Sequence, residues 1–256
     1  MPRGSEDELI DGLRDHISKL GCILKDYIEA YCEDKGIEDI SPYFLHPETQ
    51  EAFLIRRSII SRVQGRDRVS SARPLLYAPQ PDIAFGPFNL CKHTSQHMQG
   101  LCSHLEEQQP ISSFLDKLRE ANQYNVTTYM AGINNYDRKL LMNIRPISDN
   151  PRCFIEIEVS HSGSRKHVLG SLINSSILGY YGVLVAEDPS ESNEDTRRKK
   201  RRRRRIDVRT AIRIKYFLMK TIQVKDIMRG KVLGENVFIV SRSQFENILK
   251  QVVEKD

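Results

Sequence analysis

Several features that mark whole classes of protein are missing from this chain of 256 residues. No apolar run reaches the roughly 18 residues that a membrane-spanning helix needs. The first residues contain no apolar segment of the kind that signal peptides carry. The chain also has no internal repeat, no Walker phosphate-binding loop, no GxGxxG motif and no legible Ser–His–Asp arrangement. These absences argue against a secreted, transmembrane or fibrous protein, and we expect no membrane partner.

Cysteine is scarce, and its number is odd. The five residues are Cys22, Cys32, Cys91, Cys102 and Cys153. Their irregular spacing, without a secretion signal, predicts free thiols in a reducing compartment. Three histidines, His93, His97 and His104, lie in the same stretch of the chain as Cys91 and Cys102. Cysteine and histidine are the residue types that bind zinc. Because the spacing matches no zinc pattern, a structural Zn²⁺ is not expected.

The positive charge of the chain is concentrated in one stretch. The formal net charge is +5, but nine of the 39 Lys and Arg residues stand in a row. They are Arg197, Arg198, Lys199, Lys200, Arg201, Arg202, Arg203, Arg204 and Arg205. Without this basic run, 30 basic residues face 34 acidic ones, so the rest of the chain is mildly acidic. The run could contact a polyanion, serve as a nuclear localisation signal or simply be solvated, and its length favours a polyanion.

Hydrophobic periodicity predicts an alternation of helices and short strands. In the first half, the predicted elements are helices over 6–34 and 48–63, a loop over 64–73, a strand over 82–85, and a helical stretch over 90–122 that is broken at Pro110. The mixed pattern over 127–147 is typical of a strand or two around the Asn134-Asn135 turn. In the second half, they are strands over 153–159, 181–186 and 237–240 and helices over 165–178, 208–228 and 243–253. This order predicts an α/β fold in which a central mixed sheet is flanked by helices.

Two glutamates lie two residues apart in the predicted strand over 153–159. The apolar residues that alternate with them would face the core, so Glu156 and Glu158 would project from the other face, toward solvent or a cleft. A sheet face that is open to water accounts for this pattern without any function.

A third acid shifts this interpretation toward a cleft. Asp82 follows a proline at the start of its own short strand, where strand ends form clefts. An Asp and a Glu from neighbouring strands supply the hard oxygen ligands that suit Mg²⁺. A metal ion there can lower the pKa of a bound water and neutralise charge on a phosphorus-centred transition state.

The motifs Pro81-Asp82 and Glu156-Ile157-Glu158 resemble those of the PD-(D/E)xK nuclease superfamily, which has the restriction-endonuclease-like fold. The predicted order of helix, strand, strand, helix and strand around them is that of the superfamily core. The resemblance covers residues 75–89 and 153–186. It implies that Asp82 and Glu156 bind the metal, with Mg²⁺ as the cofactor and Mn²⁺ as a substitute.

The chain departs from the family pattern in two places. Glu158 stands where most members have a lysine that helps to activate the attacking water. Some members have Glu there, and in others the lysine lies on the following helix, where Lys166 is placed here, so both residues are catalytic candidates. The separation of 74 positions between Asp82 and Glu156 implies an inserted helical subdomain.

The start of the predicted helix over 165–178 carries groups that suit a phosphate. Ser164 offers a hydroxyl next to the backbone N–H groups of a helix N-terminus, and Arg165, Lys166 and His167 add positive charge. With the basic run, these four are the predicted nucleic-acid contacts. A capped helix packed on the sheet accounts for the same residues, and Gly170 in that helix would either permit close backbone approach or serve packing.

The resemblance suggests five segments. They are N-terminal helices and first core strands (1–89), an inserted subdomain (90–150), a catalytic βαβ segment (151–187), a disordered acidic and basic linker (188–205), and a helix-strand-helix unit that completes the core (206–256).

The function that the resemblance implies is that of a metal-dependent endodeoxyribonuclease, similar to type II restriction enzymes. It would hydrolyse phosphodiester bonds of double-stranded DNA as a homodimer whose two-fold axis matches that of the duplex. The expected compartment is the cytoplasm, or the nucleus if the basic run is a targeting signal. The alternatives are a non-catalytic nucleic-acid-binding protein with a nuclease-like fold and an α/β interaction protein.

Overall fold

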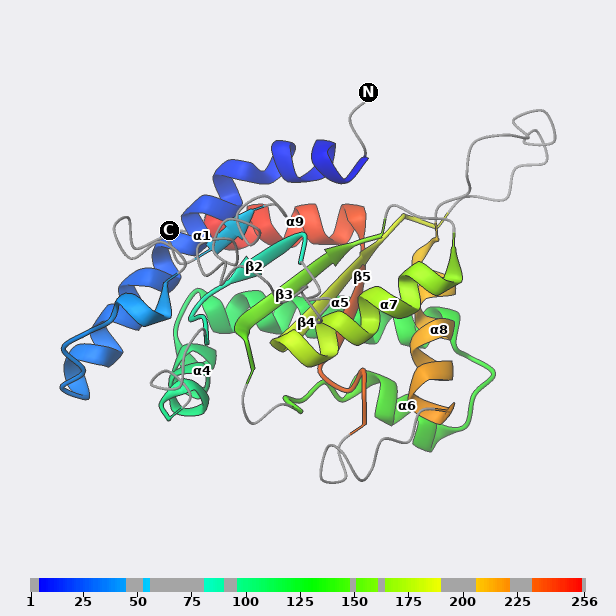
Figure 1. Ribbon diagram of the computed structural model, residues 1–256. Coiled ribbons are helices and arrows are strands. Elements are labelled where there is room, and N and C mark those ends of the chain that lie inside the picture. Colours follow the sequence, from blue (N-terminus) through cyan, green and yellow to red (C-terminus); the bar gives the residue numbers. More distant parts are fainter. Residues whose placement is uncertain are drawn as a thin grey trace, which may run out of the picture.

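The computed structural model describes residues 5–44, 53–55, 81–89, 96–147, 151–160, 164–189, 206–221 and 232–254. The helices are α1 (Ser5–Asp34), α4 (Met98–Glu107), α5 (Ile111–Tyr129), α6 (Asn135–Met142), α7 (Arg165–Leu178), α8 (Val208–Thr221) and α9 (Arg242–Val253), with a 3₁₀ turn, η1 (Ser41–Tyr43). The strands are β1 (Phe53–Ile55), β2 (Ile83–Phe85), β3 (Cys153–Val159), β4 (Gly179–Ala186) and β5 (Val237–Ser241). The predicted α/β class, with a central mixed sheet between helices, is confirmed (Figure 1).

The sheet has the order β1-β2-β3-β4-β5. Strand β2 is antiparallel to both of its neighbours, β1 and β3, whereas β3, β4 and β5 run parallel to one another. Helices cover both faces, so every residue of β3 is buried. In the centre of the sheet, Glu156 lies opposite Ala84 of β2 and Gly182 of β4.

Two layers of helices enclose the sheet (Figure 1). On one face, α1, α4 and α9 share an apolar core with β2, β3 and β4. On the other face, α7 and α8 pack in a second core with β4 and β5. The helix α5 runs along the β5 edge and contributes its first half to one core and its second half to the other.

Side chains form hydrogen bonds with the backbone groups of β5 that point away from β4. Asn122 accepts a hydrogen bond from the Ile239 N–H (3.1 Å), and Asn125 donates one to the Ile239 carbonyl (3.0 Å). On the same edge, the ammonium of Lys215 donates to the Val237 carbonyl at 2.6 Å. A strand edge without such partners would be open to pairing with another chain. These polar residues therefore occupy the β5 edge of the sheet from within the chain.

Two predicted elements are wrong where the structure describes them. Residues 53–55 form strand β1 instead of part of a helix, because this short apolar run pairs with β2. Residues 135–142 form helix α6 instead of the expected strand or two around a turn, because the Asn134 side chain caps the helix by accepting the Asp137 N–H at 2.8 Å. The predicted loop over 64–73 lies outside the described residues.

The close packing of α7 on the sheet depends on Gly182. A Cβ atom there would lie 2.7 Å from the Ser175 Cβ and 2.8 Å from the Ser175 carbonyl oxygen. At Gly170, which the sequence analysis singled out, a Cβ would meet no atom within 4 Å. Close approach therefore occurs at the strand glycine, and Gly170 is not its site.

These two glycines provide a matched pair of substitutions. We expect Gly182→Ala to lower the free energy of unfolding by about 2–3 kcal/mol, because backbone must shift to admit the methyl group. Gly170→Ala should raise it by up to about 1 kcal/mol, because alanine favours the helix. Urea unfolding of both variants measures the difference, and equal effects would show that α7 does not pack tightly at Gly182.

Candidate active site

The structure brings the three predicted acids together beneath α7. Asp82 directly precedes β2, and Glu156 and Glu158 belong to the neighbouring strand β3. Their exposed fractions are 1%, 0% and 8% respectively. The possibility of a sheet face open to water is therefore wrong, because α7 covers this face of β3 and β4.

Asp82 and Glu158 are each held by a hydrogen bond. The Oδ2 atom of Asp82 accepts the backbone N–H of Val159 at 2.8 Å, which fastens the start of β2 to the end of β3. The Oε2 atom of Glu158 accepts the hydroxyl of Ser171, on α7, at 3.0 Å. These bonds fix the two carboxyl groups close to Glu156.

Glu156 is the least compensated of the three acids. Burial, followed by the negative charges of Glu158 and Asp82, raises the pKa of its carboxyl group well above the usual value, while the nearby Ser175 hydroxyl opposes the shift. Both carboxyl oxygens are shielded from solvent, and neither has a well-formed hydrogen bond with any described residue. Burying a carboxylate in this way is costly unless a cation or hydrogen-bond donors compensate it.

The donor chemistry fits a divalent cation. Carboxylate oxygens are the preferred ligands of Mg²⁺, and Glu156 presents two of them close to two further carboxyl groups. Within the described ranges, no three or more His, Cys, Asp or Glu side chains form a ready-made metal site. This agrees with the hydrogen bonds of Asp82 and Glu158, because each bond uses one carboxyl oxygen that would otherwise be available to a metal ion.

Four of the residues predicted to contact nucleic acid lie at the start of α7, the helix that covers this site. Ser164 is the N-cap residue of α7, and Arg165, Lys166 and His167 form its exposed first turn. The Lys166 side chain forms no hydrogen bond or ion pair with the three acids or with any other residue that the structure describes. The basic run, 197–205, lies outside the described residues.

Sequence reasoning missed the two serines that α7 places over the acids. Ser171 and Ser175 are four residues apart, so they lie on one side of the helix. Their spacing on a helix that follows a strand with two glutamates was the available signal. It is weak, because serine at this spacing also occurs on ordinary packed helices.

The cysteines bear out one prediction. Cys22, Cys32, Cys102 and Cys153 are free thiols, and Cys91 lies outside the described residues, as does His93. Cys102 is buried, and the His104 ring packs against Tyr31, with 5.2 Å between the ring centroids.

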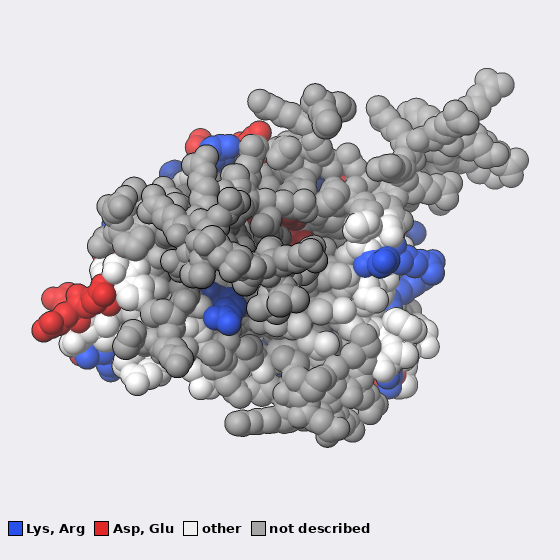
Figure 2. All heavy atoms as spheres, viewed as in Figure 1, with Lys and Arg blue, Asp and Glu red and all other residues white. Residues whose placement is uncertain are grey.

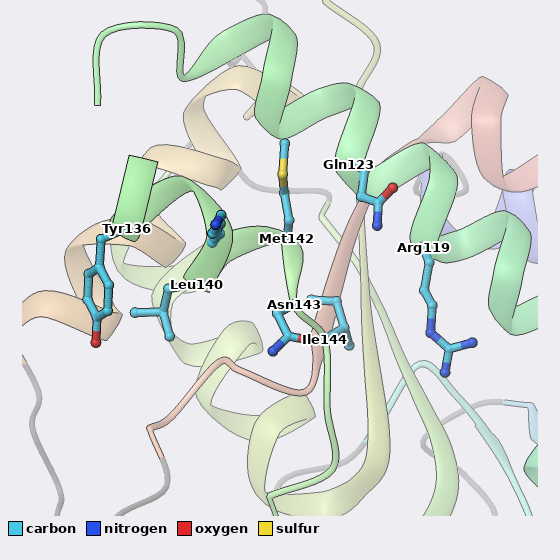
Figure 3. Close-up of a pocket in the computed structure, with 8 residues that line it drawn as sticks. Arg119, Gln123, Tyr136, Leu140, Met142, Asn143 and Ile144 are labelled. Carbon is cyan, nitrogen blue, oxygen red and sulfur yellow. The ribbon is translucent and has the colours of Figure 1, made fainter. Parts of the chain in front are cut away.

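A separate hollow of about 560 Å³ lies between α5 and α6 (Figure 3). Its lining residues are Arg119, Gln123, Tyr136, Lys139, Leu140, Met142, Asn143 and Ile144. Arg119 donates hydrogen bonds to Asp116 at 2.7 Å and to the Tyr181 hydroxyl at 3.2 Å. Its charge is thus already compensated within the protein, and the three acids do not line this hollow.

Comparison with family models, curated proteins and solved structures finds no match to this chain. In the described part of the chain, no helix is long and apolar enough to cross a membrane. The site must therefore be interpreted from its own chemistry.

Proposed function

We propose that this protein is a metal-dependent endodeoxyribonuclease of the restriction-endonuclease-like class. The observation that carries the proposal is the buried group of Asp82, Glu156 and Glu158, with Glu156 lacking well-formed hydrogen bonds to described residues. The element order also supports it. Helix α1 precedes antiparallel strands β1, β2 and β3, and α7 then leads to β4, which is parallel to β3.

Each acid has a distinct role in this proposal. Asp82 and Glu156 would hold Mg²⁺, or Mn²⁺ in its place, from neighbouring strands. When bound, the metal would make water a stronger nucleophile and offset the charge that develops on the phosphoryl group. Water would attack phosphorus in line with the leaving oxygen, so that one P–O bond forms as the other breaks.

We assign the water-positioning role to Glu158. It lies next to Glu156 and is oriented by Ser171, and a carboxylate can accept a proton from water. Lys166 lies in the exposed first turn of α7, so a phosphate contact suits it better. Ser164, Arg165, His167 and the basic run would contribute further phosphate contacts, and two-strand cleavage would need a homodimer.

One observation favours a second candidate, a nucleic-acid-binding protein without catalysis. Glu156 is fully buried beneath α7, so a phosphodiester can reach it only if the covering elements move. The presence of Glu158 at the position where most family members have lysine also favours this candidate.

Asp82→Asn tests the proposal against this alternative. We expect wild type to cleave plasmid and phage DNA with Mg²⁺, and the variant to cleave about 10²-fold more slowly, because a negative ligand is lost. The amide oxygen can still accept the Val159 N–H, so folding should persist. Gel assays of cleavage, with DNA binding measured in EDTA, separate the two functions.

The matched control is Asp137→Asn. Asp137 is equally buried, but it pairs with Lys220 at 2.6 Å and lies on α6, away from the acids. This variant should lose stability and keep its cleavage rate. If wild type binds DNA but cleaves nothing with Mg²⁺ or Mn²⁺, the non-catalytic candidate replaces the nuclease.

A further inference from the structure

The chain returns to the edge of the candidate site just after the basic run. The N–H of Glu187, which follows β4, donates to the Ile206 carbonyl at 3.1 Å, and the Val208 N–H donates to the Glu187 carbonyl at 3.0 Å. Asp207 thereby forms a parallel bridge with Glu187. These bonds fix the point at which α8 begins.

Backbone N–H and C=O groups point to alternate sides along β4, and this shows on which side of the strand the bridge lies. The Val185 carbonyl accepts the N–H of Ser160, at the end of β3, whereas the N–H of Gly182 donates to Asn236, next to β5. Backbone groups of alternate residues point to the same side of a strand. Glu187, two residues beyond Val185, therefore faces the β3 side, and residues 206–208 continue the line of β3.

This position places the first turn of α8 beside the site's edge. Residues 206–208 lie just beyond Ser160, the residue that follows β3. The backbone N–H of Val159, one residue before Ser160, donates to the Asp82 carboxylate. The helix α7 starts from the same end of β3, after Ser164. Two helix N-termini, each with partial positive charge, therefore lie at the end of β3 where Asp82 and Glu158 meet.

The exposed surface of these helices is basic. Together, α7 and α8 contain six Lys and Arg residues and no Asp or Glu. Arg165 and Lys166 of α7 and Arg209 and Arg213 of α8 are exposed. None of the four forms an ion pair with another described residue, and the guanidinium of Arg209 lies 5.3 Å from the centre of the Tyr129 ring of α5. Figure 2 shows basic side chains gathered at the end of α7 that lies next to α8. Outside α7, α8 and the basic run, 24 basic residues face 34 acidic ones, so this surface differs in sign from the rest.

We infer that Arg209 and Arg213, the α8 arginine pair, bind the phosphate backbone of the DNA that enters the candidate site. The two side chains are four residues apart, so they lie on one side of α8, separated by about 6 Å along its axis. Exposed arginines at this spacing suit successive anionic groups of a polyanion. The inference rests on the proposed function for the identity of that polyanion.

The test is the salt dependence of binding to a short labelled duplex, measured by fluorescence anisotropy in EDTA so that nothing is cleaved. Each phosphate contact contributes about 0.9 to the slope of log affinity against log salt concentration. We expect Arg209→Gln with Arg213→Gln to reduce this slope by about 1.8 relative to wild type. The variant should keep its melting temperature, because both side chains are exposed.

The matched control is Lys19→Gln with Lys250→Gln. It removes two exposed positive charges from α1 and α9, on the opposite face of the sheet, and should leave the slope unchanged. An equal loss of slope in both double variants would overturn the inference, since net charge would then explain the binding. An unchanged slope in the α8 variant, or no binding by wild type, would also overturn it.

This outcome is separable from that of the proposed function. Binding that depends on the α8 arginine pair in a protein that never cleaves DNA would support the inference and refute the nuclease. Cleavage by wild type, together with a slope that is the same in wild type and the α8 variant, would support the nuclease and refute the inference.

Discussion

Glu156→Gln is expected to abolish Mg²⁺-dependent cleavage, with a loss of about 10³-fold or more. This effect should exceed that of Asp82→Asn, because one oxygen of Asp82 already accepts the Val159 N–H, whereas neither Glu156 oxygen has a well-formed hydrogen bond with a described residue. The same change should not destabilise the protein in EDTA. Glutamine has nearly the same shape, and it cannot ionise in a buried place where Glu158 and Asp82 already disfavour a negative charge.

Thermal unfolding with and without Mg²⁺ gives a second measurement that does not depend on activity. A ligand that binds only the folded state raises the melting temperature, so Mg²⁺ should stabilise wild type and have little effect on Glu156→Gln. Glu235→Gln is the matched control, because Glu235 is equally buried but pairs with Arg145 at 3.1 Å. It should lose stability and keep both the response to Mg²⁺ and the cleavage. Equal Mg²⁺ stabilisation of wild type and Glu156→Gln would remove Glu156 from the metal site.

Lys215→Met is expected to change how stability depends on pH. Lys215 is 1% exposed, and burial lowers the pKa of its ammonium group from 10.5 to about 7, with Glu235 opposing the shift. Between these values the unfolded chain binds the proton and the folded protein does not, so raising the pH stabilises the fold. Below about pH 7 both states are protonated, and the folded state bears the full cost of a buried charge.

The comparison of Lys215→Met with wild type isolates this effect. The variant loses the hydrogen bond to the Val237 carbonyl, which gives an offset that does not depend on pH. From about pH 6 to about pH 9.5, wild type should gain roughly 3 kcal/mol in unfolding free energy relative to the variant. Urea unfolding at both pH values measures this gain, with Lys250→Met, at an exposed position, as the control. A constant difference between Lys215→Met and wild type would mean that Lys215 keeps an ordinary pKa in the fold.

Local patterns in the sequence were sufficient for most of the core elements. Apolar residues at three- and four-residue steps over 6–34 predicted α1, and alternation over 153–159 predicted β3 with its bounds. Where local patterns failed, a partner elsewhere decided the structure. The residues of β1 pair with β2, and the Asn134 cap produced α6 in place of the expected strand or two around a turn. Hairpin turns and helix caps use the same residue types, so the sequence alone does not separate them.

For the candidate site, the sequence by itself determined which acids were available and the strand face they share. Alternation in β3 places Glu156 and Glu158 together, and the proline before Asp82 marks a strand start. Only the tertiary structure decided that this face is dry, because burial depends on whether α7 packs on it, and that packing depends on Gly182 in a different strand. The place of α8 beside the same edge was decided in the same way, by backbone bonds between Glu187 and residues 206–208. Such bonds join segments that are distant in the chain and are made by backbone groups that every residue shares, so no local pattern of side chains records them.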